Sequence, residues 1–588
     1  MGSIIKKVKK GKPYYYAVES GRVNGKPRIV WQKYLGTIEA IVERVAGATP
    51  PVPKETVIFE AGGVAALLRI AERLGLMELI NELVPKRDQG PSVGHYLLLA
   101  AINRALDPCS KLAIGAWYEQ TVLRRLWRFP ASAFSSPRFW DHMDRVSEQD
   151  IEAIEERLVP RVEAGFGINP QLLLYDTTNF FTFIATSNAR SSLAQRGHSK
   201  AKRHDLRQVG LALLVSQDFQ VPLLHKIYDG NIPDVSLFPR MARTLIARFA
   251  QLGGATRPVT LVFDKGNVSE EGMEELLAAG VPFLAALPAS RLPEFIERPM
   301  ADFSPVTSMP GTRAWAAPVE LYAKACLGVV AYTESFFTQQ LSGVTANMVK
   351  CEKKLLDLQK SLKKWDEGKA RGKRPTAAGV RKSVAAILSP QFMKNLFRTT
   401  VEEENNLPRL RYEVDHAALQ TLVEKRLGRT VLLSAHTDWS AAQTIEGYRS
   451  LARIEEVFKN MKNIQFLHWQ PAWHWTDQKL RVHALYCVLA LLLATLARKT
   501  AAEHGCELSL PALLEELTHI REVAILYPPR NHGPPQRPHR TLAHVSTPEK
   551  TRRVPGNRPS PSSPKGVILS LNCNSSCIKH PKRMSPRK

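Results

Sequence analysis

The sequence is poor in features that mark whole classes of protein. Cysteine is scarce, with seven among 588 residues, and its irregular spacing argues against a disulfide framework or a paired zinc motif. Cys573, Cys577 and His580 lie close together but lack a fourth ligand, so we expect no zinc site there. No leader with a charged and then an apolar segment is present, so we do not expect secretion. The longest apolar run, 484–497, is too short for a bilayer and predicts a buried helix without a membrane partner.

Acidic residues are also in deficit. The chain has 55 Asp and Glu against 81 Lys and Arg, which gives a net charge of +26 and a pI near 9.8. Such an excess suits a polyanion, most often nucleic acid, although membrane-surface and ribosome-associated proteins share it. Hydrophobic residues make up 44% of the chain and fall into periodic segments, so the length predicts several globular domains.

The segment 448–462 predicts one amphipathic helix. Its apolar face consists of Leu451, Ile454, Val457, Phe458 and Met461. Tyr448, Glu455 and Lys462 recur at heptad spacing along one margin of that face, whereas Glu456 points to the opposite side. A carboxylate on the margin can be held by the core while its oxygens reach a cleft, so Glu455 is the candidate functional acid. The alternative is an ion pair between Glu455 and Lys459 on a solvated surface.

Two apolar runs upstream each end in an aspartate. Residues 172–175 and 259–263 predict buried strands, followed by Asp176 and Asp264. An ionised aspartate at such a position is costly unless it is paired or binds a cation. Either residue alone is compatible with a simple turn at the end of a strand. Together with Glu455 they would form an oxygen cage of the kind that Mg²⁺ prefers.

These acids, with Tyr448 and Lys462 flanking Glu455, resemble the DDE transposases of bacterial insertion sequences. More narrowly, they resemble the subgroup with a Tyr–Arg–Glu–Lys signature on its last catalytic helix. The resemblance covers about residues 1–500 and includes the segments 101–111 and 469–475. One position departs from the signature, because Leu451 stands where the arginine is expected.

The resemblance implies a reaction and its site. Asp176, Asp264 and Glu455 would hold two Mg²⁺ ions, with Mn²⁺ as a possible substitute, for cleavage at element ends and transfer of the 3′-hydroxyl into target DNA. The implied partners are double-stranded DNA at the ends and the target, and a second copy of the chain in a homodimer. The implied location is the bacterial cytoplasm, at the nucleoid. The side chains expected to contact DNA are Tyr448, Lys462, Lys459, Arg453, Lys200, Lys202 and Arg203.

Two other functions stay open. A nuclease with the same core but without strand transfer would need the same acids. An inactive derivative of a transposase would bind DNA without metal-dependent chemistry.

The predicted architecture is multi-domain α/β, with a ribonuclease-H-like catalytic core interrupted by an insertion. The predicted parts are a basic β element with a linker (1–54), a helical DNA-end-binding domain (55–168), the first part of the core (169–300), the insertion (301–430), the second part of the core (431–526) and a disordered basic tail (527–588). The first part of the core should contain an antiparallel meander, a helix over 236–250 and the Asp264 strand, which puts Asp176 and Asp264 on adjacent strands. Asp229 and Asp234 are interpreted as turn residues.

For three of the predicted parts, two alternative roles stay open. The lysines and tyrosines of the N-terminal element suit phosphate contact, but they also suit a solvated β edge protected by lysines. The helical region fits a packing or dimerisation domain as well as DNA binding. The insertion should contain a basic helical arm around Leu355, Leu362 and Trp365, whose lysines either contact DNA or merely solvate the arm.

Overall fold

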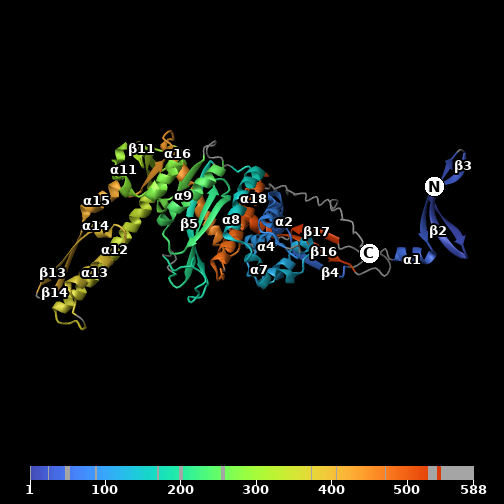
Figure 1. Ribbon diagram of the computed structural model, residues 1–588, viewed down its shortest axis with the longest axis horizontal. Helices are drawn as coiled ribbons and strands as arrows, with labels where there is room; N and C mark the ends of the chain where they lie inside the picture. The colour runs from blue at the N-terminus through green and yellow to red at the C-terminus, as the bar shows by residue number, and fades with distance from the viewer. Residues whose placement is uncertain are drawn as a thin grey trace, which may run out of the picture. The chain divides into compact units, whose positions relative to one another are not determined.

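The computed structural model describes residues 2–23, 25–46, 53–86, 89–168, 171–197, 203–252, 259–372, 374–404, 407–470, 472–527 and 539–544 (Figure 1). They form a mixed α/β structure with one large mixed sheet, three small sheets and many helices. Lys200, Lys202 and the Cys573–His580 cluster lie outside the described residues.

The N-terminal segment is a three-stranded antiparallel sheet followed by a short helix. Its elements are β1 (Gly2–Lys9), β2 (Lys12–Val23), β3 (Lys26–Gly36) and α1 (Ile38–Ala46). Gly25, next to the start of β3, has a positive φ of 77°, which is typical of a hairpin connection. The predicted β element is therefore confirmed.

The following segment is helical, as predicted. It comprises α2 (Gly62–Leu74), α3 (Leu76–Leu83), α4 (Val93–Leu106), α5 (Ile114–Glu119), α6 (Leu123–Trp127), α7 (Ser136–Met143) and α8 (Glu148–Phe166). Gly75 ends α2 in the left-handed conformation with φ of 58°, which favours glycine. The segment opens with β4 (Glu55–Glu60), which pairs antiparallel with β16 (Ile520–Leu526) near the other end of the described chain.

The large sheet has nine strands in the order β10-β11-β12-β15-β9-β8-β5-β6-β7. One half contains an antiparallel meander of β5 (Leu172–Thr182), β6 (Arg207–Ser216) and β7 (Pro222–Asp229). β5 then pairs in parallel with β8 (Thr260–Phe263), and β8 pairs in parallel with β9 (Phe283–Leu287). The predicted meander, helix and strand are confirmed, with α9 (Asp234–Gln251) and α10 (Glu270–Ala278) between strands.

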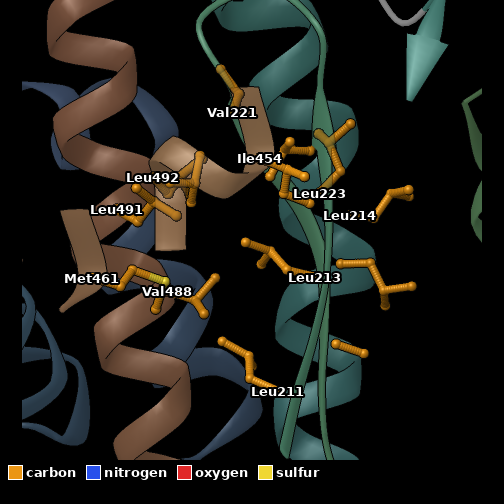
Figure 2. Packing of buried hydrophobic residues seen from close by; sticks show 14 of the residues in the cluster. Leu211, Leu213, Leu214, Val221, Leu223, Ile454, Met461, Val488, Leu491 and Leu492 are labelled. Atoms are coloured by element: carbon orange, nitrogen blue, oxygen red, sulfur yellow. The ribbon is translucent and has the colours of Figure 1, made fainter. Parts of the chain in front are cut away.

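Helices cover both faces of this half of the sheet. Tyr175 of β5 and Phe263 of β8 contact the ring of Phe238 in α9. On the opposite face lie α17 (Ala452–Met461) and α18 (Asp477–Glu503). Figure 2 shows Leu211 and Leu213 of β6 on the side toward these two helices, whereas Leu214 lies on the other side of the strand. This alternation is the two-residue period of a strand covered on both faces.

The predicted insertion divides into two parts. β10 (Ser304–Pro305), β11 (Thr312–Leu321) and β12 (Lys324–Thr333) extend the large sheet, because β12 pairs with β15 (Arg429–Ser434). Residues 334–427 instead build a second hydrophobic cluster. Its elements are α12 (Glu334–Asp366), α13 (Ala377–Ile387), α14 (Met393–Leu396), β13 (Phe397–Glu404), β14 (Leu407–Val414) and α15 (His416–Lys425). The basic helical arm was predicted, whereas the sheet strands before it were not.

The C-terminal segment corrects two expectations. α18 has 27 residues and is long and apolar enough, by length and composition, to cross a membrane; 94% of its most apolar window is buried inside the protein. The buried helix expected over the apolar run 484–497 is therefore longer than predicted, because it begins at Asp477 and ends at Glu503. In the predicted disordered tail, β17 (His539–His544) pairs with the free edge of β16. The rest of that tail lies outside the described residues.

Candidate active site

Asp176 and Asp264 lie side by side on adjacent parallel strands. The last parallel pair of β5 and β8 is Tyr175 with Phe263, and each aspartate is the next residue. Strands at this spacing bring neighbouring backbones to about 4.8 Å. Because Tyr175 and Phe263 both face α9, their neighbours point to the other face of the sheet. β5 does not end at Asp176 as expected, since it continues to Thr182 against β6.

Tyr448 joins the two aspartates to the helices on that face. It belongs to α16 (Ala441–Arg449), and its hydroxyl donates a hydrogen bond of 2.7 Å to Oδ1 of Asp264. Burial raises the pKa of Tyr448, and the negative charges of Asp264, Asp176 and Glu455 raise it further. All three predicted acids therefore act electrostatically on one phenol, which stays neutral and serves as a donor.

The helix that carries Glu455 is not continuous with the one that carries Tyr448. α16 ends at Arg449 and α17 begins at Ala452, so the single helix predicted over 448–462 is wrong. At the break, the Ser450 hydroxyl donates to the carbonyl oxygen of Gly447 at 2.6 Å. Such a local side-chain bond competes with regular helix geometry. The apolar spacing continues across the break and gives no sign of it.

The predicted apolar face is nevertheless confirmed. Leu451, Ile454, Val457, Phe458 and Met461 are all buried. Glu455 and Glu456 are both exposed. Within the described part of the chain, the Glu455 side chain forms no ion pair or hydrogen bond, so the alternative pairing with Lys459 is absent there. Glu455 is thus available to a ligand on the face shared with Asp176, while no described contact involves Glu456.

Lys462 lies at the end of α17, beside the strand that carries Asp176. Its Nζ donates a hydrogen bond of 2.8 Å to Oγ1 of Thr178 and lies 5.3 Å from the ring centre of Phe180. Thr178 is two residues after Asp176, so both side chains point to the same face. The predicted stripe of Tyr448, Glu455 and Lys462 therefore borders the aspartates, although its spacing arises from two helices.

The other side chains predicted to contact DNA differ in whether they already have a partner within the protein. Arg453 donates to the carbonyl oxygen of Gln217 at 3.0 Å, and Lys459 is exposed. Arg203 pairs with Asp205 at 2.8 Å, and this contact lowers the pKa of Asp205 to about 2. The pairing offsets much of the positive charge that Arg203 would offer to a phosphate.

The departure at Leu451 has a structural explanation. Leu451 is 8% exposed and packs in the core, where a guanidinium would be costly without partners. The nearby Arg449 does not replace the signature arginine, because it donates to the hydroxyls of Thr312 and Thr333. This contact ties α16 to β11 and β12 instead.

A cavity of about 630 Å³ adjoins Lys462. Its walls are the second half of β5, the loop 230–234 and the segment 468–470. Trp469 stacks on Phe180 with ring centres 4.5 Å apart, and its buried Nε1 has no partner among the described residues. The segment 468–470 is held from behind by Arg104 of α4, which donates to the carbonyl oxygens of His468 and Gln470 at 3.1 and 2.9 Å.

The chemical type of the available ligands suits a hard divalent cation. Carboxylate oxygens are the ligands that Mg²⁺ prefers, and two of them lie on adjacent strands. In the part of the chain that the structure describes, however, no group of three or more His, Cys, Asp or Glu side chains lies close enough to hold one ion. Asp176 and Asp264 therefore fit a cation as a pair, and Glu455 does not complete a cage.

Two features of the site were not predicted. The first is a second tyrosine–aspartate pair, in which Tyr228 donates to Oδ1 of Asp234 at 3.1 Å. Asp234 begins α9, so it is more than the turn residue expected, whereas Asp229 ends β7. The second is the support of segment 468–470 by Arg104, which lies 364 residues from His468 in sequence. No local pattern signals a contact over that separation.

Comparison with known proteins gives only distant structural similarity. No protein-family model matches the chain, and no curated protein matches it. Among solved structures, the chain is similar to a piggyBac transposase in a synaptic complex with hairpin DNA, at 10% identity and a TM-score of 0.32. The match covers 77% of this chain and 79% of the other. A likeness of this size does not establish a shared fold.

Proposed function

We propose that this chain is a DDE transposase with a ribonuclease-H-like core, which cleaves DNA at insertion-sequence ends and joins the 3′-hydroxyl to target DNA. One relationship carries the proposal. Asp176 and Asp264 follow the last parallel pair of two adjacent strands, and the phenol of Tyr448 donates to Asp264 while the charges of Asp176 and Glu455 also raise its pKa. The strand order β7-β6-β5-β8-β9, three antiparallel strands and then two parallel ones, supports a ribonuclease-H-like core.

The proposed cofactor is a pair of Mg²⁺ ions, for which Asp176 and Asp264 are the two ligands that lie on adjacent strands. Glu455 does not complete a cage in this structure, so as the proposed third ligand it would have to move closer to the aspartates when metal and DNA bind. Mg²⁺ bound there would lower the pKa of a coordinated water and would stabilise negative charge on the scissile phosphate. The Tyr448 hydroxyl orients Asp264 by donating to one carboxylate oxygen, which leaves the other oxygen for a cation. Lys462 supplies a positive point charge beside Thr178, where a phosphate of the cleaved strand would lie. No residue of the site needs to form a covalent bond to DNA.

The proposed partners are double-stranded DNA and a second copy of the chain. The net charge of +26 supports a polyanionic partner. Two element ends have to be held together during transposition, which favours a dimer. We propose the bacterial cytoplasm as the location, because the substrate is the bacterial chromosome.

The test is a cleavage assay with single substitutions that remove one charge each. The substrate is a supercoiled plasmid that carries the element encoding this chain with its flanking DNA, incubated with Mg²⁺. Asp176→Asn, Asp264→Asn and Glu455→Gln should each lower cleavage by about a hundredfold or more, because each removes a cation ligand. DNA binding measured by gel shift should stay close to wild type.

Glu456→Gln is the matched control, since it changes the adjacent exposed carboxylate on the same helix. It should cleave at the wild-type rate. Wild-type cleavage by Glu455→Gln would remove that residue from the site. A pre-cleaved end with a free 3′-hydroxyl then separates transposase from nuclease, because only a transposase joins it to a second plasmid.

A further inference from the structure

The insertion helix α12 has two faces of opposite character. Val344, Cys351, Leu355 and Leu362 are buried in the second hydrophobic cluster, against α13 and the β13–β14 hairpin. Their seven- and four-residue spacing places them on one line of the helix. One face of α12 is therefore committed to packing within the insertion.

The opposite face carries a line of lysines, which we call the lysine stripe. At 100° per residue its members span an arc of about 120°, which includes the direction opposite the buried line and extends from there to one side. They are Lys350, Lys353, Lys354, Lys360 and Lys364, and all five are exposed. Asp357 is the acidic residue within that arc. Among the residues that the structure describes, none of the five lysines forms an ion pair.

Three acids of the insertion pair with arginines rather than with these lysines. Arg398 pairs with Asp415 at 2.8 Å, and Arg409 pairs with Glu404 at 2.5 Å and with Asp366 at 3.2 Å. These contacts neutralise the arginines of the β13–β14 hairpin. The described ion pairs include none with the lysine stripe, so this side of α12 carries five lysines whose charge is not neutralised by an ion pair.

The spacing of the lysines within the stripe also destabilises the isolated helix. Lys350 and Lys354, and likewise Lys360 and Lys364, are like charges four residues apart, which repel each other on a helix surface. A helix that is merely solvated usually alternates charge signs at that spacing. Repelling lysines are stabilised when a polyanion neutralises them together.

We infer that the lysine stripe binds the phosphate backbone of double-stranded DNA without reading its sequence. From Lys350 to Lys364 the helix rises about 21 Å, which matches about six base pairs of duplex. Lysine offers a mobile point charge rather than the bidentate geometry that recognises a base edge. The inference rests on the proposed function, since it names the surface with which the insertion holds the DNA that is cut or joined.

The experiment measures binding of the full-length protein to a fluorescent duplex of unrelated sequence at several salt concentrations. The triple variant Lys353→Gln, Lys360→Gln and Lys364→Gln should bind at least tenfold more weakly. The slope of log affinity against log salt should fall by about one for each lysine that contacts a phosphate. The corresponding triple change to arginine keeps the charge and should restore binding.

Single variants provide the matched comparison. Lys360→Gln should weaken binding, whereas Lys363→Gln, on the same helix but about 60° or more from the stripe, should not. Thermal melting of every variant checks that the fold is intact. If the glutamine triple binds like wild type with an unchanged salt slope, the stripe does not bind DNA and an acidic protein surface becomes the better partner.

The two proposals fail in different ways. Asp264→Asn tests the catalytic site and should leave the salt slope unchanged. The glutamine triple should recover cleavage when DNA is raised to saturation, because the acids are untouched. Loss of cleavage by the triple at saturating DNA would overturn the assignment of a purely binding role.

Discussion

The hydroxyl of Tyr448 donates to Oδ1 of Asp264 at 2.7 Å, across 184 residues of sequence. This bond connects α16 to the end of β8 and fixes the orientation of a predicted catalytic acid. The tyrosine is partly buried, so the bond is shielded from water and from competing donors. Two measurable consequences follow from it.

The first is that Tyr448→Phe should destabilise the protein at neutral pH. The variant keeps the ring packing and loses one hydrogen bond to a charged acceptor, which contributes about 1.5–3 kcal/mol. Asp264 is partly exposed and regains water, which keeps the loss at the lower end of that range. Urea unfolding at pH 7 gives the free energy of unfolding. In the cleavage assay the variant should retain DNA binding and lose rate, because Asp264 is no longer oriented.

The second consequence concerns alkaline pH. Burial and the three carboxylates raise the pKa of Tyr448, whereas a tyrosine in the unfolded chain ionises near pH 10. The stability that depends on neutral Tyr448 is therefore complete below pH 10 and is lost as pH rises above 10. The Tyr448→Phe variant has no ionisable group at this position, so it does not lose stability in this way. The gap in unfolding free energy between wild type and Tyr448→Phe should narrow above pH 10, and parallel curves would contradict the raised pKa.

Acid sensitivity should arise from His474. Burial lowers the pKa of His474 well below its usual range, and the charges of Lys111 and Arg104 lower it further. Both ring nitrogens are buried without a partner among the described residues. The unfolded chain therefore binds a proton below about pH 6.5 that the folded chain does not, and stability falls as pH drops through that value.

His474→Phe should abolish the uptake of this proton on unfolding. At pH 7.5 the variant should lie within about 1 kcal/mol of wild type, because no hydrogen bond is lost and the ring shape is similar. Between pH 6.5 and 5.5 its unfolding free energy should fall by about 1 kcal/mol less than that of wild type. Buried His483 still titrates in the variant, so some acid sensitivity remains. Identical pH profiles would show that His474 does not contribute.

The sequence predicted those parts of the structure that are encoded by residues close together in the chain. The helical segment predicted within 55–168 was found because signals such as those of α4 are local: its apolar residues begin after the capping residue Ser92 and stop before Asp107. The Asp264 strand and its neighbours were found from short apolar runs. The three acids were found by motif resemblance, and their placement around Tyr448 agrees with it without testing their chemistry.

The errors came from contacts that no local pattern encodes. The break at Ser450 was missed because apolar spacing continues through it. β11 and β12 were missed although Leu327–Ala331 is an apolar run, since their sheet position depends on pairing with β15 a hundred residues later. The role of Arg104 depends on carbonyl oxygens in a distant loop. Side chains that hold backbone atoms leave no periodic signal in the sequence.

Replacement of Arg104 should test that distant contact. The guanidinium is 3% exposed and donates to the carbonyl oxygens of His468, Gln470 and Cys109. Arg104→Met leaves these acceptors without a donor in a buried place and should cost about 3 kcal/mol. The segment 468–470 should then become more accessible to hydrogen exchange. Arg69→Met, at an exposed site in α2, serves as the control and should change stability little.

The last prediction concerns how closely α16 approaches the sheet. A Cβ on Gly447 would lie 2.9 Å from Cδ2 of Leu284 in β9 and 3.5 Å from the Trp439 ring. Leu284 is fully buried, so it has little room to move, and Gly447→Ala should cost about 1–2 kcal/mol. Gly165 in α8 has open space around its added Cβ, so Gly165→Ala should be neutral or slightly stabilising.

Because Gly447 precedes Tyr448, the same change should also disturb the site. If the added methyl group moves α16 away from β9, the distance from the Tyr448 hydroxyl to Asp264 increases. Gly447→Ala should therefore lower the cleavage rate as well as the stability. Combining Gly447→Ala with Tyr448→Phe separates the two effects in a double-mutant cycle. If the glycine acts through the hydroxyl, the double variant should cleave no more slowly than Tyr448→Phe alone. Additive losses would mean that close packing of α16 matters to catalysis by a route other than this hydrogen bond.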